Sequence, residues 1–226
     1  MNQELPAARA LRCRFEKCGP IRYISHLDLT RAFHRAFARA GVPLKFSEGF
    51  SPHPKFAFAL PLSVGTESVV ELADFTLKPG FEMETEALRS ALQEQMPAGI
   101  RLVAITEQGE KFSRIAFATY RVVLPKMDPE QIASACEALK GSLVIQKKNK
   151  KGKLVEKDIS AGIRSLDFEP CEEGVVLSAC LSAAGESYLK PETVLEVLEN
   201  RLGEAPFAER GILRTGVYFE DMTPFC

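Results

Sequence analysis

One capped helix near the start of the chain sets the strongest constraint on the fold. Ser25 is a good N-cap, and Asp28, three residues later, suits the positive end of the helix dipole. Gly41 ends the helix, and Pro43 prevents its continuation. Between these signals, apolar residues recur at spacings of three and four: Leu29, Ala32, Phe33, Ala36, Phe37 and Ala40. The sequence therefore predicts a helix to about Ala40 with one buried face.

Strand patterns flank this helix. In residues 10–16, Leu11, Cys13 and Phe15 alternate with polar residues, which predicts a first strand. After the helix we expect a short strand at 44–46, strands at 56–61 and 69–77, a helix at 83–95 and a strand at 100–106. This order predicts an α+β fold, specifically a ferredoxin-like β-α-β-β-α-β unit with an inserted loop.

The second half of the chain repeats this kind of pattern. We expect a strand at 118–124, a helix at 129–140 opened by Asp128 and closed at Gly141, hairpins at 143–159 and 162–184, a helix at 191–202 and a strand at 212–219. The sequence thus predicts two tandem ferredoxin-like units with antiparallel sheets, 1–109 and 110–226. The first hairpin turn holds a lysine cluster, Lys147 to Lys153, which suits either nucleic-acid binding or solubility.

Composition excludes several classes of protein. No apolar run approaches the roughly 20 residues needed to span a bilayer, and the N-terminus lacks the basic-then-apolar order of a signal peptide. We therefore expect a cytoplasmic protein with no membrane association. The six cysteines form no C-x-x-C pair, which argues for reduced thiols and against an internal iron–sulfur cluster. No metal or other cofactor is predicted.

Positive charge gathers in the first 60 residues. They hold ten Lys or Arg residues against four Asp or Glu residues, although the whole chain has a formal net charge of −1. Arg31, Arg35 and Arg39 recur every four residues along the predicted helix, and only Asp28 can pair with them locally. Such a stripe is either a solvated helix face or a surface for phosphates.

A proline-stiffened loop, Ser47–Phe56, follows. Pro52 and Pro54 flank His53, while Gly49 permits a tight bend. Stiff loops lose little entropy on binding, so they suit recognition. We expect phosphate contacts from Arg22, Arg31, Arg35 and Lys55, and base reading or stacking by His26, Phe50 and His53. The expected supporting residues are Ser25, Asp28, Ser47, Glu48 and Gly49.

The histidines also permit two chemical interpretations. His26 or His53 could act as general base or acid on an RNA 2′-hydroxyl, which would make a metal-independent endoribonuclease. Alternatively, histidines could ligate a metal with Asp28 or Glu48, but His26 and His34 lie about two helical turns apart, too far for one ion. His34 lies off the apolar stripe, and we expect it to be exposed.

The stretch from Phe15 to Leu77 resembles the radical SAM-linked protein family, a bacterial domain of unknown function found alone or fused to the C-terminal end of radical SAM proteins. The resemblance rests on Ser25-His26-Leu27-Asp28, on the Arg-Ala-Gly turn at Arg39–Gly41, and on the loop Gly49–Lys55, where Ser51 replaces a common Asn. It implies a radical SAM enzyme as a partner in trans. The tandem layout also looks like that of CRISPR repeat-processing endoribonucleases, an analogy of fold only.

Together these patterns predict a non-enzymatic RNA-binding or substrate-presenting accessory module that works with a radical SAM enzyme in RNA modification. Two alternatives stay open: the endoribonuclease that uses His26 or His53, and a scaffold that binds only protein. The oligomeric state and the identity of the RNA have no signal in the sequence.

Overall fold

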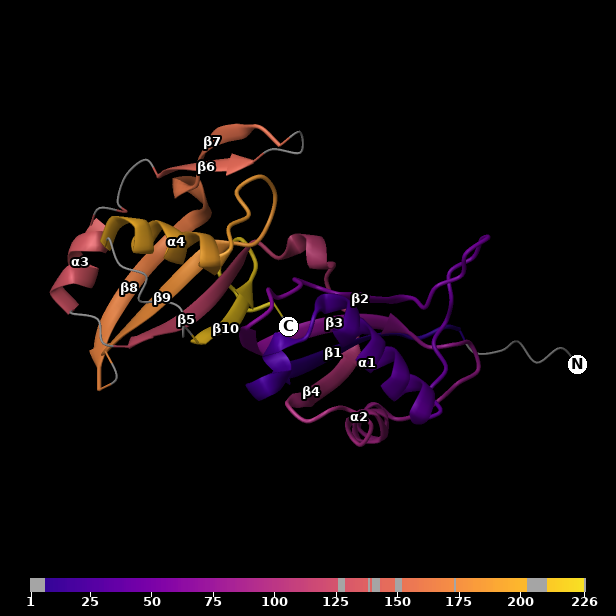
Figure 1. Ribbon diagram of the computed structural model, residues 1–226. Coiled ribbons are helices and arrows are strands. Elements are labelled where there is room, and N and C mark those ends of the chain that lie inside the picture. Colours follow the sequence, from indigo (N-terminus) through magenta and orange to yellow (C-terminus); the bar gives the residue numbers. More distant parts are fainter. Residues whose placement is uncertain are drawn as a thin grey trace, which may run out of the picture. The chain divides into compact units, whose positions relative to one another are not determined.

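The computed structural model describes residues 7–125, 129–137, 139, 143–148, 152–172, 174–202 and 211–225. The chain forms two compact units, the first running to Phe112 and the second covering Ser113–Phe225. Each unit combines antiparallel strands with two α-helices (Figure 1). The predicted α+β class is therefore confirmed. Among the described residues, no helix is both long enough and apolar enough to cross a membrane.

The first unit contains four strands and two α-helices. Its elements are β1 (Ala10–Lys17), the 3₁₀ helix η1 (Gly19–Tyr23), α1 (His26–Arg39), β2 (Phe56–Phe58), β3 (Thr66–Thr76), α2 (Thr85–Gln93) and β4 (Ile100–Glu107). The 3₁₀ helix η2 (Phe112–Arg114) begins at the last residue of this unit and continues into the second. Strand β1 lies between β4 and β3, antiparallel to both. Strand β2 pairs with β3 residues Ala73–Phe75, which β1 also contacts, so β2 lies on the opposite side of β3.

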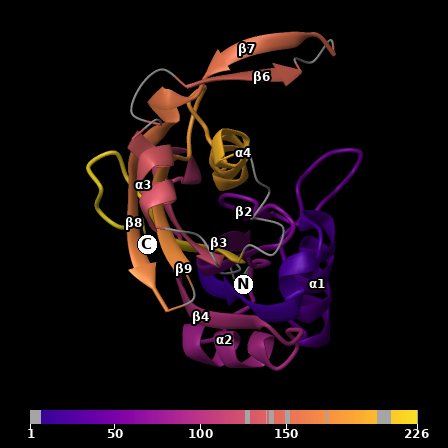
Figure 2. The same cartoon turned by 60° about the vertical axis from the view of Figure 1, so that its left-hand side comes forward.

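The core of this unit follows from the alternation in β1. Leu11, Cys13 and Phe15 are buried on one face of the sheet, and α1 and α2 cover that face (Figures 1 and 2). Helix α1 contributes Leu29, Phe33, Ala36 and Phe37, as its apolar stripe predicted, and α2 contributes Leu88 and Leu92. The predicted pattern of the first strand and of the capped helix is confirmed.

The second unit has a four-stranded antiparallel sheet and a separate hairpin. Its elements are β5 (Phe117–Pro125), α3 (Pro129–Glu137), β6 (Val144–Lys148), β7 (Leu154–Asp158), the 3₁₀ helix η3 (Ser160–Gly162), β8 (Ile163–Cys171), β9 (Gly174–Ser182), α4 (Pro191–Leu202) and β10 (Gly211–Tyr218). The sheet order is β10-β5-β9-β8, whereas β6 pairs only with β7 among the described strands.

Several expected elements differ in the structure. Residues 44–46 form no strand; Leu44 makes an isolated bridge to Leu77, and Phe46 makes one to Pro54. The strand expected at 56–61 is only three residues long, Phe56–Phe58, and Ala59 N–H adds one further backbone bond to Leu72 O of β3. The expected N-cap Asp128, the helix end at Gly141 and residues 149–151 of the lysine cluster lie outside the described residues.

Candidate functional site

The start of α1 is held by a compact set of hydrogen bonds. The Ser25 hydroxyl accepts the backbone N–H of Asp28 (3.1 Å) and donates to the Asp28 carboxylate (2.7 Å). Arg31 donates to the other carboxylate oxygen at 2.9 Å. These contacts, first the bond from Ser25 and then the one from Arg31, lower the pKa of Asp28. Ser25 is the predicted N-cap, and Arg31 is an ion-paired residue on the surface.

Two histidines of α1 contact phenylalanines of β2. His26 is exposed and meets Phe58 edge-on, with ring centroids 5.4 Å apart. His34 makes the same kind of contact with Phe56 at 5.4 Å. The expectation that His34 is exposed is wrong: it is half-buried, its Nε2 is shielded from solvent without a hydrogen-bond partner among the described residues, and burial lowers its pKa. The reason is the position of β2 beneath the helix, which local spacing does not reveal.

The segment Lys45–Lys55, which we call the arm, is a hairpin-like extension between α1 and β2 (Figure 1). Its two sides are joined by backbone bonds from Lys55 N–H to Lys45 O and from Ser47 N–H to His53 O, both 2.8 Å. Gly49 has φ +123°, a conformation that favours glycine. At the tip, Phe50 is fully exposed. The arm therefore presents an aromatic ring that no core contact requires.

One residue fixes His53 on the arm. Ser47 Oγ lies 2.9 Å from His53 Nδ1 and accepts the backbone N–H of His53 at 3.1 Å. The ring Nδ1 also lies 3.4 Å from the Ser51 carbonyl oxygen, so this nitrogen is engaged within the arm in either tautomer of the ring. Among the described residues, no hydrogen bond to Nε2 is recorded. The Nε2 atom of His53 is therefore the ring nitrogen available to a ligand.

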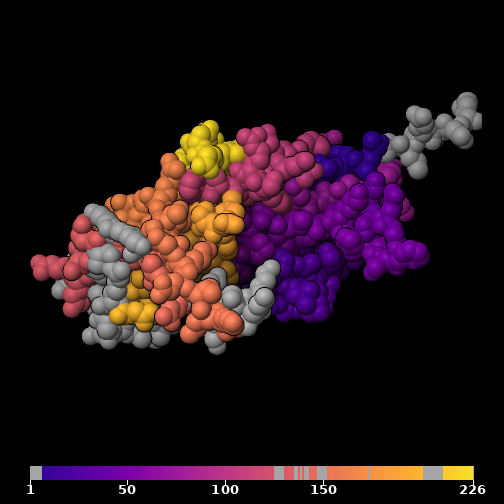
Figure 3. Space-filling model, turned by 90° about the horizontal axis from the view of Figure 1, so that it is seen from above, coloured from indigo at the N-terminus to yellow at the C-terminus, as the bar shows by residue number. Residues whose placement is uncertain are grey.

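The base of the arm gathers positive charge. Lys45 and Lys55 lie opposite each other, and both are tied to Thr76 of β3 through backbone hydrogen bonds of 2.8 and 3.0 Å. In the part of the chain that the structure describes, Lys45, Lys55, Arg35 and Arg39 have no recorded ion pair. Figure 3 shows the surface of the first unit from above, coloured from indigo to magenta. The sequence analysis did not predict Lys45 and Arg39 as phosphate contacts. For Lys45, its position could have been noticed in the sequence, because Lys45 and Lys55 are equally far from the tip residue Phe50.

Arg22 is already engaged within its own unit. Its guanidinium lies 3.6 Å from the Glu67 carboxylate, bonds the Tyr23 hydroxyl at 2.9 Å and stacks over that ring at 4.9 Å. The bond to Tyr23 is the main cause of a raised pKa for Arg22. Glu67, which comes from β3, was missed because it lies 45 positions away in the sequence. A phosphate contact from Arg22 would have to compete with these partners.

Metal-binding clusters and reactive thiols are not evident at this site. The described residues contain no group of three or more His, Cys, Asp or Glu side chains placed to hold a metal ion. Four cysteines are described, Cys13, Cys18, Cys171 and Cys180, and all are free thiols. Burial raises the pKa of Cys13 to about 12, so its thiol stays protonated at neutral pH.

A family model covers most of the chain. Residues 10–191 match the model described as an uncharacterized protein conserved in bacteria, DUF2344. The chain belongs to the DUF2344 family. The match includes α1, the arm, every strand of the first unit and every strand of the second unit except β10. The expectation of a bacterial domain of unknown function is thereby confirmed for this DUF2344 member.

Solved structures add a likeness of fold. A chain of a Cbf5–Nop10–Gar1 complex aligns with a TM-score of 0.50 and 11% identity, over 92% of this chain and 48% of that one, so this chain spans about half of its length. An unknown protein from Galdieria sulphuraria aligns with a TM-score of 0.28 and 12% identity, over 91% of this chain and 96% of that one. No curated protein matches the sequence.

Proposed function

We propose that the first unit binds RNA through the arm and the adjoining face of α1. The observation that carries this proposal is the fully exposed Phe50 at the tip of an arm whose base sets Lys45 opposite Lys55. A fully exposed aromatic ring offers a stacking surface, and every base has a face on which it can stack. The two lysines supply charge for the adjacent phosphates.

The other exposed groups fit the same ligand. Arg35 and Arg39 recur on one face of α1 and are exposed. His53, held through Nδ1 by Ser47, offers Nε2 as a hydrogen-bonding atom for a base edge. Arg31 would join by exchanging its exposed pair with Asp28, because surface pairs are weak, with a median of about 0–1 kcal/mol.

We also propose the wider setting of this activity. The resemblance to radical SAM-linked proteins suggests an accessory role in the cytoplasm, in which this chain presents RNA to a radical SAM enzyme that modifies it. Each unit is further proposed to be ferredoxin-like. The orders β4-β1-β3-β2 and β10-β5-β9-β8, both antiparallel, support that assignment.

The test is a titration of the full chain with a fluorescent single-stranded RNA oligonucleotide at several salt concentrations. Affinity should fall as salt rises, and the variant Lys45→Ala/Lys55→Ala should bind more weakly with a shallower slope, by about 0.7 per lost phosphate contact. Phe50→Ala should weaken binding roughly tenfold without changing the salt slope. Lys111→Ala/Lys190→Ala removes the same charge from exposed positions elsewhere and should bind like the wild type.

Incubation of the same RNA with the protein in EDTA separates the alternatives. Intact RNA with salt-dependent binding supports the accessory role. RNA cleavage that disappears in His26→Ala or His53→Ala would instead establish the metal-independent endoribonuclease. Failure to bind any RNA at low salt would exclude both the accessory role and the endoribonuclease. The scaffold that binds only protein would then be the remaining alternative.

A further inference from the structure

The edge strands of the two units differ in whether side chains bond their outer backbone groups. In the first unit, Gln93 of α2 covers the outer edge of β4: its amide donates to Ile100 O (3.1 Å) and accepts from Leu102 N–H (2.6 Å). Arg89 donates to Leu102 O at 3.3 Å. These bonds replace those of a further strand, so they block the edge. In the second unit β8 is the edge strand, and among the described residues its backbone has no recorded partner beyond β9.

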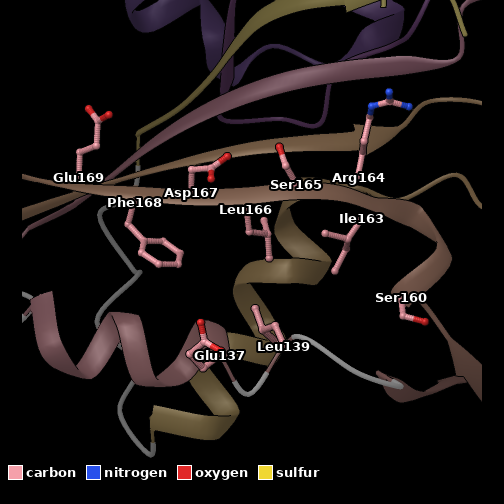
Figure 4. A pocket seen from close by; sticks show the side chains of 10 residues that line it. All are labelled: Glu137, Leu139, Ser160, Ile163, Arg164, Ser165, Leu166, Asp167, Phe168 and Glu169. Atoms are coloured by element: carbon pink, nitrogen blue, oxygen red, sulfur yellow. The ribbon is translucent and has the colours of Figure 1, made fainter. Parts of the chain in front are cut away.

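A groove of about 730 Å³ runs along β8. Ile163, Leu166 and Phe168 point from the strand toward α3 and Leu139 and are only half-buried (Figure 4). The groove therefore offers apolar contacts on the helix side of an unpaired strand. An extended chain that pairs with such an edge gains backbone hydrogen bonds and places alternate side chains in the groove.

The opposite face of β8 carries negative charge. Asp167 and Glu169 point away from the groove and are exposed, and Glu137 of α3 lies at the groove itself (Figure 4). Among the described residues that line the groove, Arg164 is the basic one, and it stacks over the Phe117 ring at 4.7 Å. This negative charge disfavours the binding of RNA. It also disfavours pairing with β8 of a second copy, because that strand carries the same acidic residues. It favours a basic segment.

We propose that the β8 edge is a docking site for an extended segment of a partner protein that alternates apolar and basic residues. The segment adds a strand beside β8, with its apolar side chains in the groove and its basic side chains beside Asp167 and Glu169. This site lies in the second unit and is independent of the RNA-binding proposal.

The experiment uses the full chain and a short fluorescent peptide that alternates valine and lysine, followed by anisotropy. The control peptide has the same composition with valines and lysines in separate blocks, so it cannot present one apolar and one basic face. The alternating peptide should bind and the block peptide should not. Amide resonances of Leu166 and Phe168 should shift on binding.

Charge reversal gives the sharper test. The variant Asp167→Lys/Glu169→Lys should bind the valine–lysine peptide about tenfold more weakly than the wild type does. It should also bind a valine–glutamate peptide. Glu196→Lys/Glu220→Lys changes net charge equally at exposed positions and should behave like the wild type. Equal binding of both charge classes, no binding, or β8 resonances that shift only on dimerisation would overturn the proposal. Circular dichroism checks that each variant is folded.

Discussion

Ser47 Oγ lies 2.9 Å from Nδ1 of His53 and also accepts the His53 backbone N–H at 3.1 Å. A single hydroxyl thus holds both the ring and the main chain of a residue six positions later. Pro52 and Pro54 restrict the same segment from either side. The arm is therefore ordered before any ligand arrives, which reduces the entropy lost on binding.

Replacing Ser47 tests this ordering. Ser47→Ala removes both bonds, so we expect weaker RNA binding, while the free energy of unfolding should fall by less than about 1.5 kcal/mol because the site is exposed. RNA titration and urea denaturation measure the two effects. Ser51→Ala is the matched control, since Ser51 contacts His53 only through its backbone carbonyl. Wild-type affinity in Ser47→Ala would contradict a role for arm order.

The N-cap of α1 predicts a defined loss of stability. Ser25→Ala leaves the Asp28 N–H without its acceptor, so the free energy of unfolding should fall by about 0.5–2 kcal/mol in urea denaturation. Ser25→Asp should restore much of it, because Asp also caps helices well. Equal loss in both variants would show that the cap is not the cause.

Asp28 predicts a pH dependence of stability. Its pKa is lowered in the folded state, so its contribution is fully present above the pKa of the unfolded chain and is lost as pH falls through the folded pKa. Asp28→Asn should therefore be less stable than the wild type at pH 7, and the two should converge in acid. Urea denaturation along a pH series measures this; a constant difference down to strongly acidic pH would contradict it.

His34 should make stability depend on pH closer to neutrality. Burial lowers its pKa, so the folded state favours the neutral ring. The resulting stability is fully present above the unfolded histidine pKa of about 6.5 and is lost as pH falls through the folded pKa. His34→Phe keeps an aromatic ring beside Phe56 and removes the titration, so stability should decline less between neutral and mildly acidic pH. Parallel pH profiles for the two proteins would exclude this role.

Replacing Gln93 tests how much its bonds to the β4 edge contribute to stability and to keeping the protein from associating. Gln93→Ala leaves Leu102 N–H and Ile100 O unbonded, at a cost of about 1–3 kcal/mol for an unsatisfied group if water does not replace the amide. It also opens the β4 edge, so association at high concentration should rise in sedimentation experiments. Glu196→Ala, at an exposed position on α4, serves as the control. An unchanged free energy of unfolding would show that water substitutes fully.

Much of the secondary structure could be predicted because its signals are local. Ser25, Asp28 and Gly41 determine where α1 begins and ends, and each acts within about one helical turn. The short strand expected at 44–46 failed, because strand pairing needs partners such as Leu77 that lie far along the chain. Local alternation cannot report whether such a partner is in reach.

The sequence by itself determined the capped helix, the stiff arm with its flanking prolines and the concentration of basic residues in the first 60 positions. Only the tertiary structure decided which of those charges are paired: Glu67 reaches Arg22 from β3, and Asp74 pairs with the buried Arg12 at 2.7 Å. It also placed Lys45 opposite Lys55 and put His34 against Phe56. The physical reason is that caps and helical periodicity act over a few residues, whereas burial and ion pairing depend on groups that only folding brings together.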